Sequence, residues 1–265
     1  MPHAELKHVR LHYRLEGRED LPLLMLVHSL GADLTLWDDV APTLGVRHRI
    51  LRCDLRGHGA SSVPPGPYTI ADLSHDLLEL LDILNVDRCD FCGLSIGGQV
   101  AMWLGANVPG RFNKWIMANT AALIGTVEGW NERITRVRGE GLDGIADEAM
   151  NRWFTAPFRQ ASPARVAEMR NVLTTTPLEG YTGCCAALRD SDLTASLTLI
   201  EAPVLVISGT HDPVIPTDDC RALAAAISRA EYVELNAGHL SAIEQSGAFG
   251  SAASAFLDGE GIQHG

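Results

Sequence analysis

The stretch Cys89-Asp-Phe-Cys-Gly-Leu-Ser-Ile-Gly97 joins a short apolar run to a Gly-x-Ser-x-Gly pentapeptide. Glycine has no side chain, so glycines at both ends of the pentapeptide let the backbone turn sharply and pass close to itself. A serine at the apex of such a strand-to-helix turn projects its hydroxyl into a cleft, an arrangement called a nucleophile elbow. Five-residue patterns also occur by chance. The prediction of an enzyme therefore depends on finding a base, an acid and an oxyanion hole elsewhere in the chain.

Further short apolar runs also end in turn residues, and we expect them to be buried parallel strands with loops at their carboxyl ends. Residues 69–84 place leucines at steps of three and four, which predicts an amphipathic helix, and a second helix is expected over 218–227. Alternating strands and helices predict an α/β fold with a doubly wound, mostly parallel sheet flanked by helices. The expected strands are residues 23–27, 50–53, 89–92, 204–208 and 232–235.

The strand signal disappears between residues 121 and 196, where the sequence is helical in character and rich in arginine and aromatic residues. We expect this segment to be a helical cap inserted into one fold. Residues 1–120 and 197–265 would then form the α/β core together.

Composition and charge restrict the possible partners. The 265 residues include 21 basic and 33 acidic side chains, and the formal charge of -12 disfavours nucleic acid or an anionic membrane as a partner. An anionic small substrate would need a local basic group.

The N-terminus lacks the pattern of an export signal and the apolar runs are too short to span a membrane, which predicts a cytoplasmic protein. Six irregularly spaced cysteines indicate reduced thiols.

Candidates for the acid and the base follow the last two expected strands. In an open α/β sheet, reactive groups collect at the carboxyl ends of the strands. Asp212 comes shortly after the strand at 204–208, and His239 comes shortly after the strand at 232–235. The chain order Ser95, Asp212, His239 is that of the α/β-hydrolase fold and differs from the chymotrypsin and subtilisin orders.

These three residue types have complementary roles in acyl transfer. A serine hydroxyl is a weak nucleophile at neutral pH, so His239 would take its proton, while Asp212 would hold the imidazole in the useful tautomer. The alternative is that His239 is a solvent-facing loop histidine and Asp212 a helix cap before Pro213. The combination with the elbow favours a catalytic triad.

An oxyanion hole requires two oriented N–H donors. We predict the backbone N–H of Ile96, at the start of a helix, and that of Leu30, in the loop after the strand at 23–27. His28 is expected to brace this loop.

The segment 54–59 holds Asp, Arg and His but lacks the spacing and further ligands of a metal site, so we expect structural hydrogen bonds there and no metal.

Nearly the whole sequence resembles the 3-oxoadipate enol-lactonases of the α/β-hydrolase superfamily. Two departures are a Val27-His28-Ser29-Leu30-Gly31 loop where members often have Ser-Asn-Ser-Leu-Gly, and Ile96 where they often have methionine. The core resemblance lies in residues 28–33, 51–61, 66–70 and 91–98, and the cap resemblance in 119–125, Trp130 with Arg133, 152–155 and 180–190.

The resemblance implies hydrolysis of 3-oxoadipate enol-lactone to 3-oxoadipate in bacterial catabolism of protocatechuate and catechol, without a metal or other cofactor. Ser95 would attack the lactone carbonyl, and His239 would protonate the departing enolate oxygen. Because burying the substrate carboxylate without a partner is costly, a cap cation should meet it. We predict Arg133 for this role, with Trp130 and Trp153 lining the pocket. The alternative is that Arg133 is a solvated helix arginine.

Two other functions remain open. A broad-specificity carboxylesterase or cofactor-free perhydrolase would share the elbow, the triad and the fold. A non-catalytic ligand-binding protein could also be built on this scaffold. The sequence leaves the oligomeric state open.

Overall fold

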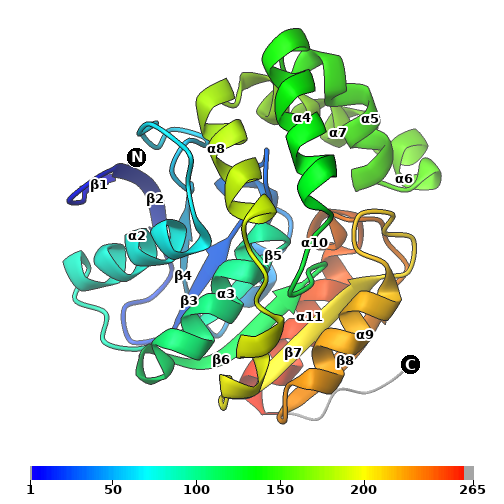
Figure 1. Ribbon diagram of the computed structural model, residues 1–265. Coiled ribbons are helices and arrows are strands. Elements are labelled where there is room, and N and C mark those ends of the chain that lie inside the picture. The colour runs from blue at the N-terminus through cyan, green and yellow to red at the C-terminus, as the bar shows by residue number, and fades with distance from the viewer. Residues whose placement is uncertain (1, 260–265) are drawn as a thin grey trace.

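The computed structural model describes residues 2–259, which form one twisted sheet with helices on both faces (Figure 1). The strand order in these residues is β1-β2-β4-β3-β5-β6-β7-β8, in which β1 and β2 are antiparallel to their neighbours and all later pairs are parallel. The predicted α/β fold is thereby confirmed. The strands are β1 (His3–Glu5), β2 (Arg10–Glu16), β3 (Leu23–Val27), β4 (Arg49–Cys53), β5 (Cys89–Leu94), β6 (Phe112–Ala118), β7 (Val204–Gly209) and β8 (Ala230–Leu235).

Helices of the core lie on the two faces of the sheet. In Figure 1, α2, α3 and α9 lie in front of the strands and α11 lies behind them. The predicted helix at 69–84 is confirmed as α2, which begins with a capping box in which Thr69 and Asp72 each accept a hydrogen bond from the other's backbone N–H. The core helices are α1 (Ala41–Leu44), α2 (Ile70–Ile83), α3 (Ile96–Asn107), α9 (Thr217–Ala226), α10 (Ser241–Glu244) and α11 (Ser246–Asp258), with short 3-10 turns at Leu34–Trp37, Pro109–Arg111 and Thr194–Leu199.

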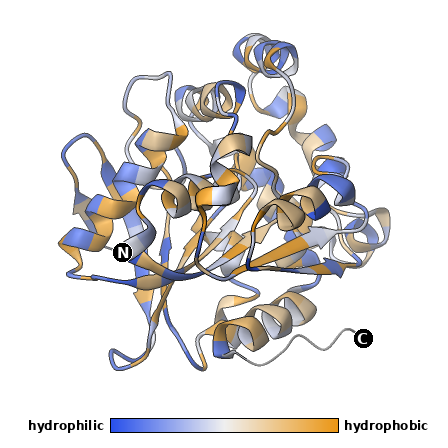
Figure 2. Ribbon diagram, turned by 60° about the horizontal axis from the view of Figure 1, so that its bottom comes forward, coloured by the Kyte–Doolittle hydropathy of each residue, from blue (hydrophilic) through white to orange (hydrophobic). Residues whose placement is uncertain are grey.

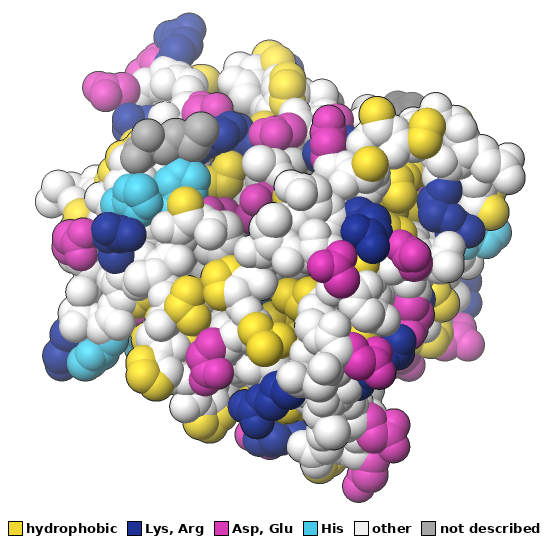
Figure 3. All heavy atoms as spheres, turned by 90° about the horizontal axis from the view of Figure 1, so that it is seen from above, with side chains coloured by type: hydrophobic (Ala, Val, Ile, Leu, Met, Phe, Trp, Pro, Cys, Tyr) yellow, Lys and Arg dark blue, Asp and Glu magenta, His cyan; other side chains and the backbone are white. Residues whose placement is uncertain are grey.

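Between β6 and β7 the chain forms a helical layer above the carboxyl ends of the strands (Figure 1). Seen from above, basic and acidic side chains lie interspersed on the surface (Figure 3), and several in this layer are paired, as Arg170 is with Asp143 and Asp147. The boundaries at residues 121 and 196 stay a prediction. The helices are α4 (Val127–Glu140), α5 (Asp143–Trp153), α6 (Ala156–Ala161), α7 (Pro163–Thr175) and α8 (Leu178–Arg189).

Three strands, β1, β2 and β6, were absent from the sequence prediction. β1 and β2 lie at one edge of the sheet and are only partly buried, so they lack a continuous apolar run. In β6, Asn113 and Lys114 interrupt the apolar signal, although Phe112 and the last four residues are buried. The omission matters because the residue after β6, Asn119, lies beside the acid and base candidates.

Burial follows the hydropathy of the elements. All five residues of β3 and all six of β5 are buried, and apolar residues concentrate along the strands in Figure 2. The six cysteines are free and buried. Among residues 2–259, no helix combines the length and apolar character needed to cross a membrane.

Candidate active site

Ser95 occupies a sharp turn between β5 and α3. Its φ of 59° and ψ of -114° are unusual for a residue with a side chain, and its N–H is held by the carbonyl of Ala118 at 2.9 Å. A Cβ on Gly93 would lie 2.1 Å from the carbonyl oxygen of Gly97, and one on Gly97 would lie 2.4 Å from that of Val27. The turn therefore requires both glycines for steric reasons.

Asp212 and His239 follow β7 and β8 and are hydrogen-bonded to each other. The distance from Nδ1 of His239 to Oδ2 of Asp212 is 2.8 Å, which leaves Nε2 of the imidazole for another partner. The N–H groups of Val214 and Ile215 donate to Oδ1 of the same carboxylate. Burial opposes ionisation of Asp212, but the charge of His239 and these hydrogen bonds together lower its pKa. The carboxylate is held as an anion against the imidazole.

Asn119 is a residue that the sequence analysis missed. Its Nδ2 donates to Oδ2 of Asp212 at 3.0 Å and to the carbonyl of Gly238 at 3.3 Å, and its Oδ1 accepts from the hydroxyl of Ser241. Asn119 is buried and has a positive φ of 46°. It thus fixes the acid and the loop of the base together. The sequence signal that could have identified Asn119 is its position: it is a polar residue directly after β6, at the carboxyl edge of the sheet.

Ser95 and His239 come together in a narrow inner cavity of about 50 Å³ between the core and the helical layer. The predicted residues Leu30, Trp130, Arg133 and Trp153 also line it, whereas Asp212 lies behind His239. The other lining residues, which the sequence analysis did not single out for this site, are Ser29, Ile124, Ala149, Arg152, Tyr181, Leu188 and Val214.

The backbone N–H groups of Leu30 and Ile96 have no acceptor within residues 2–259. Ile96 is the first residue of α3, and the first N–H groups of a helix have no partner in the helix. In the loop of Leu30, Nδ1 of His28 contacts the carbonyl of Ser29 at 2.8 Å, while its Nε2 accepts from the N–H of Leu55 at 2.9 Å. Burial lowers the pKa of His28, so it is a neutral brace.

The segment 54–59 makes structural hydrogen bonds. Asp54 accepts from the N–H groups of Leu34 and Ala60, and the Arg56 guanidinium binds Asp76 through two hydrogen bonds of 2.6 Å. Within the described chain, no group of three or more His, Cys, Asp or Glu side chains could hold a metal ion.

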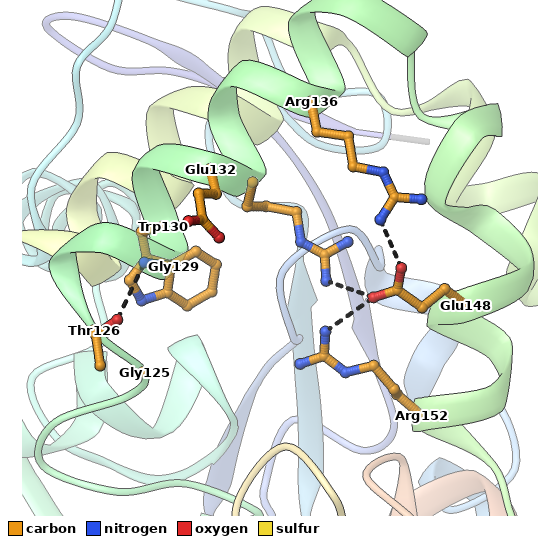
Figure 4. Close-up of a pocket in the computed structure, with 9 residues that line it drawn as sticks. Gly125, Thr126, Gly129, Trp130, Glu132, Arg136, Glu148 and Arg152 are labelled. Carbon is orange, nitrogen blue, oxygen red and sulfur yellow. Dashed lines mark hydrogen bonds and ion pairs between the residues drawn. The ribbon is translucent and has the colours of Figure 1, made fainter.

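An outer pocket of about 320 Å³ adjoins the inner cavity and shares Trp130, Arg133 and Arg152 with it. Figure 4 shows Glu148 facing arginines from α4 and α5. Arg136 donates to Glu148 at 2.7 Å, whereas Arg133 and Arg152 lie 3.6 and 3.5 Å from its other oxygen. The hydrogen bond from Arg136 is the main cause of the lowered pKa of Glu148. Glu148 is therefore ionised, and it pairs with Arg133 and Arg152, the two arginines that line the inner cavity.

Arg133 keeps one hydrogen-bonding group without a partner. Its side chain is only 16% exposed, and its Nη1 is buried with no hydrogen-bond partner among residues 2–259. A buried guanidinium N–H without a partner is costly, so a ligand that accepts from it would be strongly favoured. By contrast, each of the three guanidinium nitrogens of Arg136 donates a hydrogen bond, to Glu140, to Glu148 and to the carbonyl of Gly144.

The two tryptophans line the inner cavity from different helices. Trp130 in α4 donates from its indole nitrogen to the carbonyl of Ile124 at 2.6 Å, which fixes the ring. Trp153, at the end of α5, is 7% exposed. Both place apolar surface beside Arg133.

Comparisons with known proteins agree with this geometry. The family model of the α/β hydrolase fold matches residues 22–246. 3-oxoadipate enol-lactonase 2 of Acinetobacter baylyi is 41% identical over 249 residues, which are 94% of this chain and 93% of the relative. 3-oxoadipate enol-lactonase 1 of the same organism is 35% identical over 235 residues, covering 89% and 88% of the two chains.

A solved structure is similar over the same length. The crystal structure of the enol-lactonase from Burkholderia xenovorans LB400 superposes with a TM-score of 0.96 and 42% identity, covering 97% of this chain and all of that one. Since the family model spans most of the sequence and these relatives are similar over nearly its whole length, the chain belongs to the α/β-hydrolase family and, within it, to the 3-oxoadipate enol-lactonases.

Proposed function

We propose that this chain is a serine hydrolase that converts 3-oxoadipate enol-lactone to 3-oxoadipate. One observation carries the proposal: a single cavity is lined by Ser95, by His239 and by Arg133, which retains a buried nitrogen without a partner. A nucleophile and base beside an unsatisfied cation suit a lactone that carries a carboxylate. The names of the two Acinetobacter relatives support this substrate.

The first half of the reaction forms an acyl-enzyme. His239 takes the proton of the Ser95 hydroxyl, and the serine oxygen attacks the lactone carbonyl while Asp212 stabilises the imidazolium. The carbonyl oxygen becomes an oxyanion that accepts from the N–H groups of Leu30 and Ile96, which are donors without a competing acceptor in the described structure. Collapse of the tetrahedral intermediate breaks the ring C–O bond, and His239 gives its proton to the enolate oxygen.

The second half of the reaction releases the acid. The opened ring stays attached to Ser95 as an ester, because the leaving oxygen belongs to the same molecule as the acyl group. Its enol isomerises to the ketone. Water, deprotonated by His239, then attacks the ester carbonyl, and the proton passes back to the serine oxygen as 3-oxoadipate departs.

Substrate selection is assigned to the helical segment 121–196. The carboxylate of the lactone would accept from Nη1 of Arg133, and the lactone ring would lie against Trp130 and Trp153. Two facts support this assignment: Arg133 lies where the inner and outer pockets meet, and its free nitrogen is shielded from water. A charge-assisted hydrogen bond is strongest in such a place.

The test is a comparison of substrates with the purified protein. We expect repeated turnover of the enol-lactone, with a kcat/KM at least about 100-fold above that for 4-nitrophenyl acetate, because only the lactone engages the cation. Similar kcat/KM values for both would favour the broad esterase. Absence of turnover on every ester and lactone would favour a binding protein.

Ser95→Ala tests the nucleophile separately. Turnover should fall by several orders of magnitude while the thermal unfolding midpoint changes little. Retained lactonase activity in a folded Ser95→Ala variant would overturn the mechanism.

A further inference from the structure

The carboxylate of Glu244, at the end of α10, accepts hydrogen bonds from two segments that are far apart in sequence. Its Oε2 accepts from the N–H of Gly238 at 3.0 Å and from the N–H of Thr155 at 3.1 Å. The hydroxyl of Thr155 donates to its Oε1. Gly238 immediately precedes His239, and Thr155 follows the cavity residue Trp153 by two positions. One side chain therefore joins the loop of the base to a wall of the cavity.

The same two segments are also in direct contact. The N–H of Leu240 donates to the carbonyl of Trp153 at 3.0 Å. A Cβ on Gly238 would lie 2.8 Å from that carbonyl oxygen, so the backbones approach as closely as glycine allows. His239 thus lies between two residues, Gly238 and Leu240, that are both fixed to the segment 153–155.

We infer that Glu244 is a positioning residue, which holds the His239 loop in register with the helical segment that carries Trp153. The inference rests on the proposed role of His239 as the base. Asp212 fixes one edge of the imidazole, but a single hydrogen bond leaves the ring free to move with its loop. Because displacements of about 1 Å in a reacting group can cost roughly 100-fold in rate, anchoring the loop to the cavity wall contributes to turnover.

Two substitutions of Glu244 distinguish a role of its hydrogen bonds from a role of its negative charge. In Glu244→Gln, the amide oxygen can accept from both N–H groups and the amide NH₂ can donate to the hydroxyl of Thr155, so the connection is kept without the charge. Glu244→Ala removes all three hydrogen bonds and leaves two N–H groups without a partner. The two variants therefore separate anchoring from electrostatics.

The experiment compares steady-state kinetics of Glu244→Ala, Glu244→Gln and a control, Glu231→Ala. Glu231 is an exposed carboxylate on β8, the strand that leads into the same loop. We expect Glu244→Ala to lower kcat by about 10-fold or more, with KM changed less than about 3-fold, since positioning of the base affects the chemical step. Glu244→Gln and Glu231→Ala should stay within about 3-fold of the unchanged protein.

Three results would overturn the inference: wild-type kcat in Glu244→Ala, equal losses in the Ala and Gln variants, or a loss confined to KM. If Glu244→Ala does not fold, Thr155→Val removes the hydroxyl hydrogen bond to Glu244, together with the one that the same oxygen accepts from the N–H of Phe158 at 3.4 Å. It should then lower kcat by about 5-fold with KM unchanged, a larger loss than the control variant is expected to show, and wild-type kcat would refute the idea.

All variants are measured on the enol-lactone and on 4-nitrophenyl acetate. Failure of the unchanged protein to turn over the lactone would contradict the proposed substrate alone, because the effect of Glu244 would still be read from the aryl ester.

Discussion

Replacement of Arg133 by methionine should impair the enzyme selectively on anionic substrates. Methionine keeps the unbranched apolar stem that packs beside Trp130 but removes the guanidinium. Arg133 is 16% exposed and its Nη1 lacks a partner in the described chain, so a substrate carboxylate would meet a largely desolvated cation. Hydrogen bonds to charged groups contribute about 1.5–3 kcal/mol, and the upper end applies to a shielded site.

A loss of about 3 kcal/mol corresponds to a fall of roughly 100-fold in kcat/KM for the enol-lactone. Most of it should come from a higher KM, because the carboxylate is distant from the reacting carbonyl and is bound equally in the ground and transition states. The assay is steady-state hydrolysis of the lactone and of 4-nitrophenyl acetate, which has no carboxylate. For the aryl ester we expect a change below about 3-fold.

Arg138→Met is the matched control, because Arg138 lies on the same helix with its side chain exposed. Folding should be little affected in Arg133→Met, since Glu148 keeps Arg136 and Arg152 as partners. An unchanged KM for the lactone would refute the carboxylate role. Equal losses on the lactone and the neutral ester would refute it as well.

Three further predictions concern the elbow, the acid and the core. Gly93→Ala should prevent the native turn, because its methyl group would lie 2.1 Å from the carbonyl oxygen of Gly97; a soluble, active variant with the native unfolding midpoint would contradict this. Asn119→Gly keeps the positive φ but removes a hydrogen bond to Asp212, so kcat should fall about 10-fold with KM little changed, and an unaltered kcat would show that the hydrogen bond is dispensable. Asp90 is buried with one oxygen unpaired in the described structure, and burial raises its pKa from 3.8 to about 6. Because an acid with a raised pKa stabilises the fold below its unfolded pKa and loses that contribution as pH rises through 6, Asp90→Asn should increase the free energy of unfolding by about 2 kcal/mol at pH 8 and by little at pH 4. Denaturant unfolding at both pH values checks this, and a pH-independent difference would contradict it.

The elements with a continuous or periodic apolar pattern were predictable. The runs at 23–27 and 89–92 became β3 and β5, since each is buried on both faces and needs no neighbour to explain its pattern. β2 and β6 were not predicted. β2 lies between the edge strand β1 and β4 and has exposed ends, and β6 has two polar residues near its start, so both depend on pairing with strands remote in sequence.

The site was predictable where local backbone chemistry reveals it. Gly93 and Gly97 identify the elbow, and the positions of Asp212 and His239 after strands identify the acid and base candidates. Glu244 and Asn119 were not found, because each acts through contacts with residues more than 80 positions away in the sequence.

By itself, the sequence determined the alternation of strands and helices, the strained turn at Ser95 and the order of the candidate triad, because these depend on local patterns and on turns that only glycine permits. Only the tertiary structure decided that Arg133, rather than Arg136, keeps a buried nitrogen without a partner among the described residues, since the difference arises from the placement of Glu148, Glu140 and the carbonyl of Gly144. Whether a charged side chain is available to a ligand depends on which partners the fold brings to it, and that information is not local.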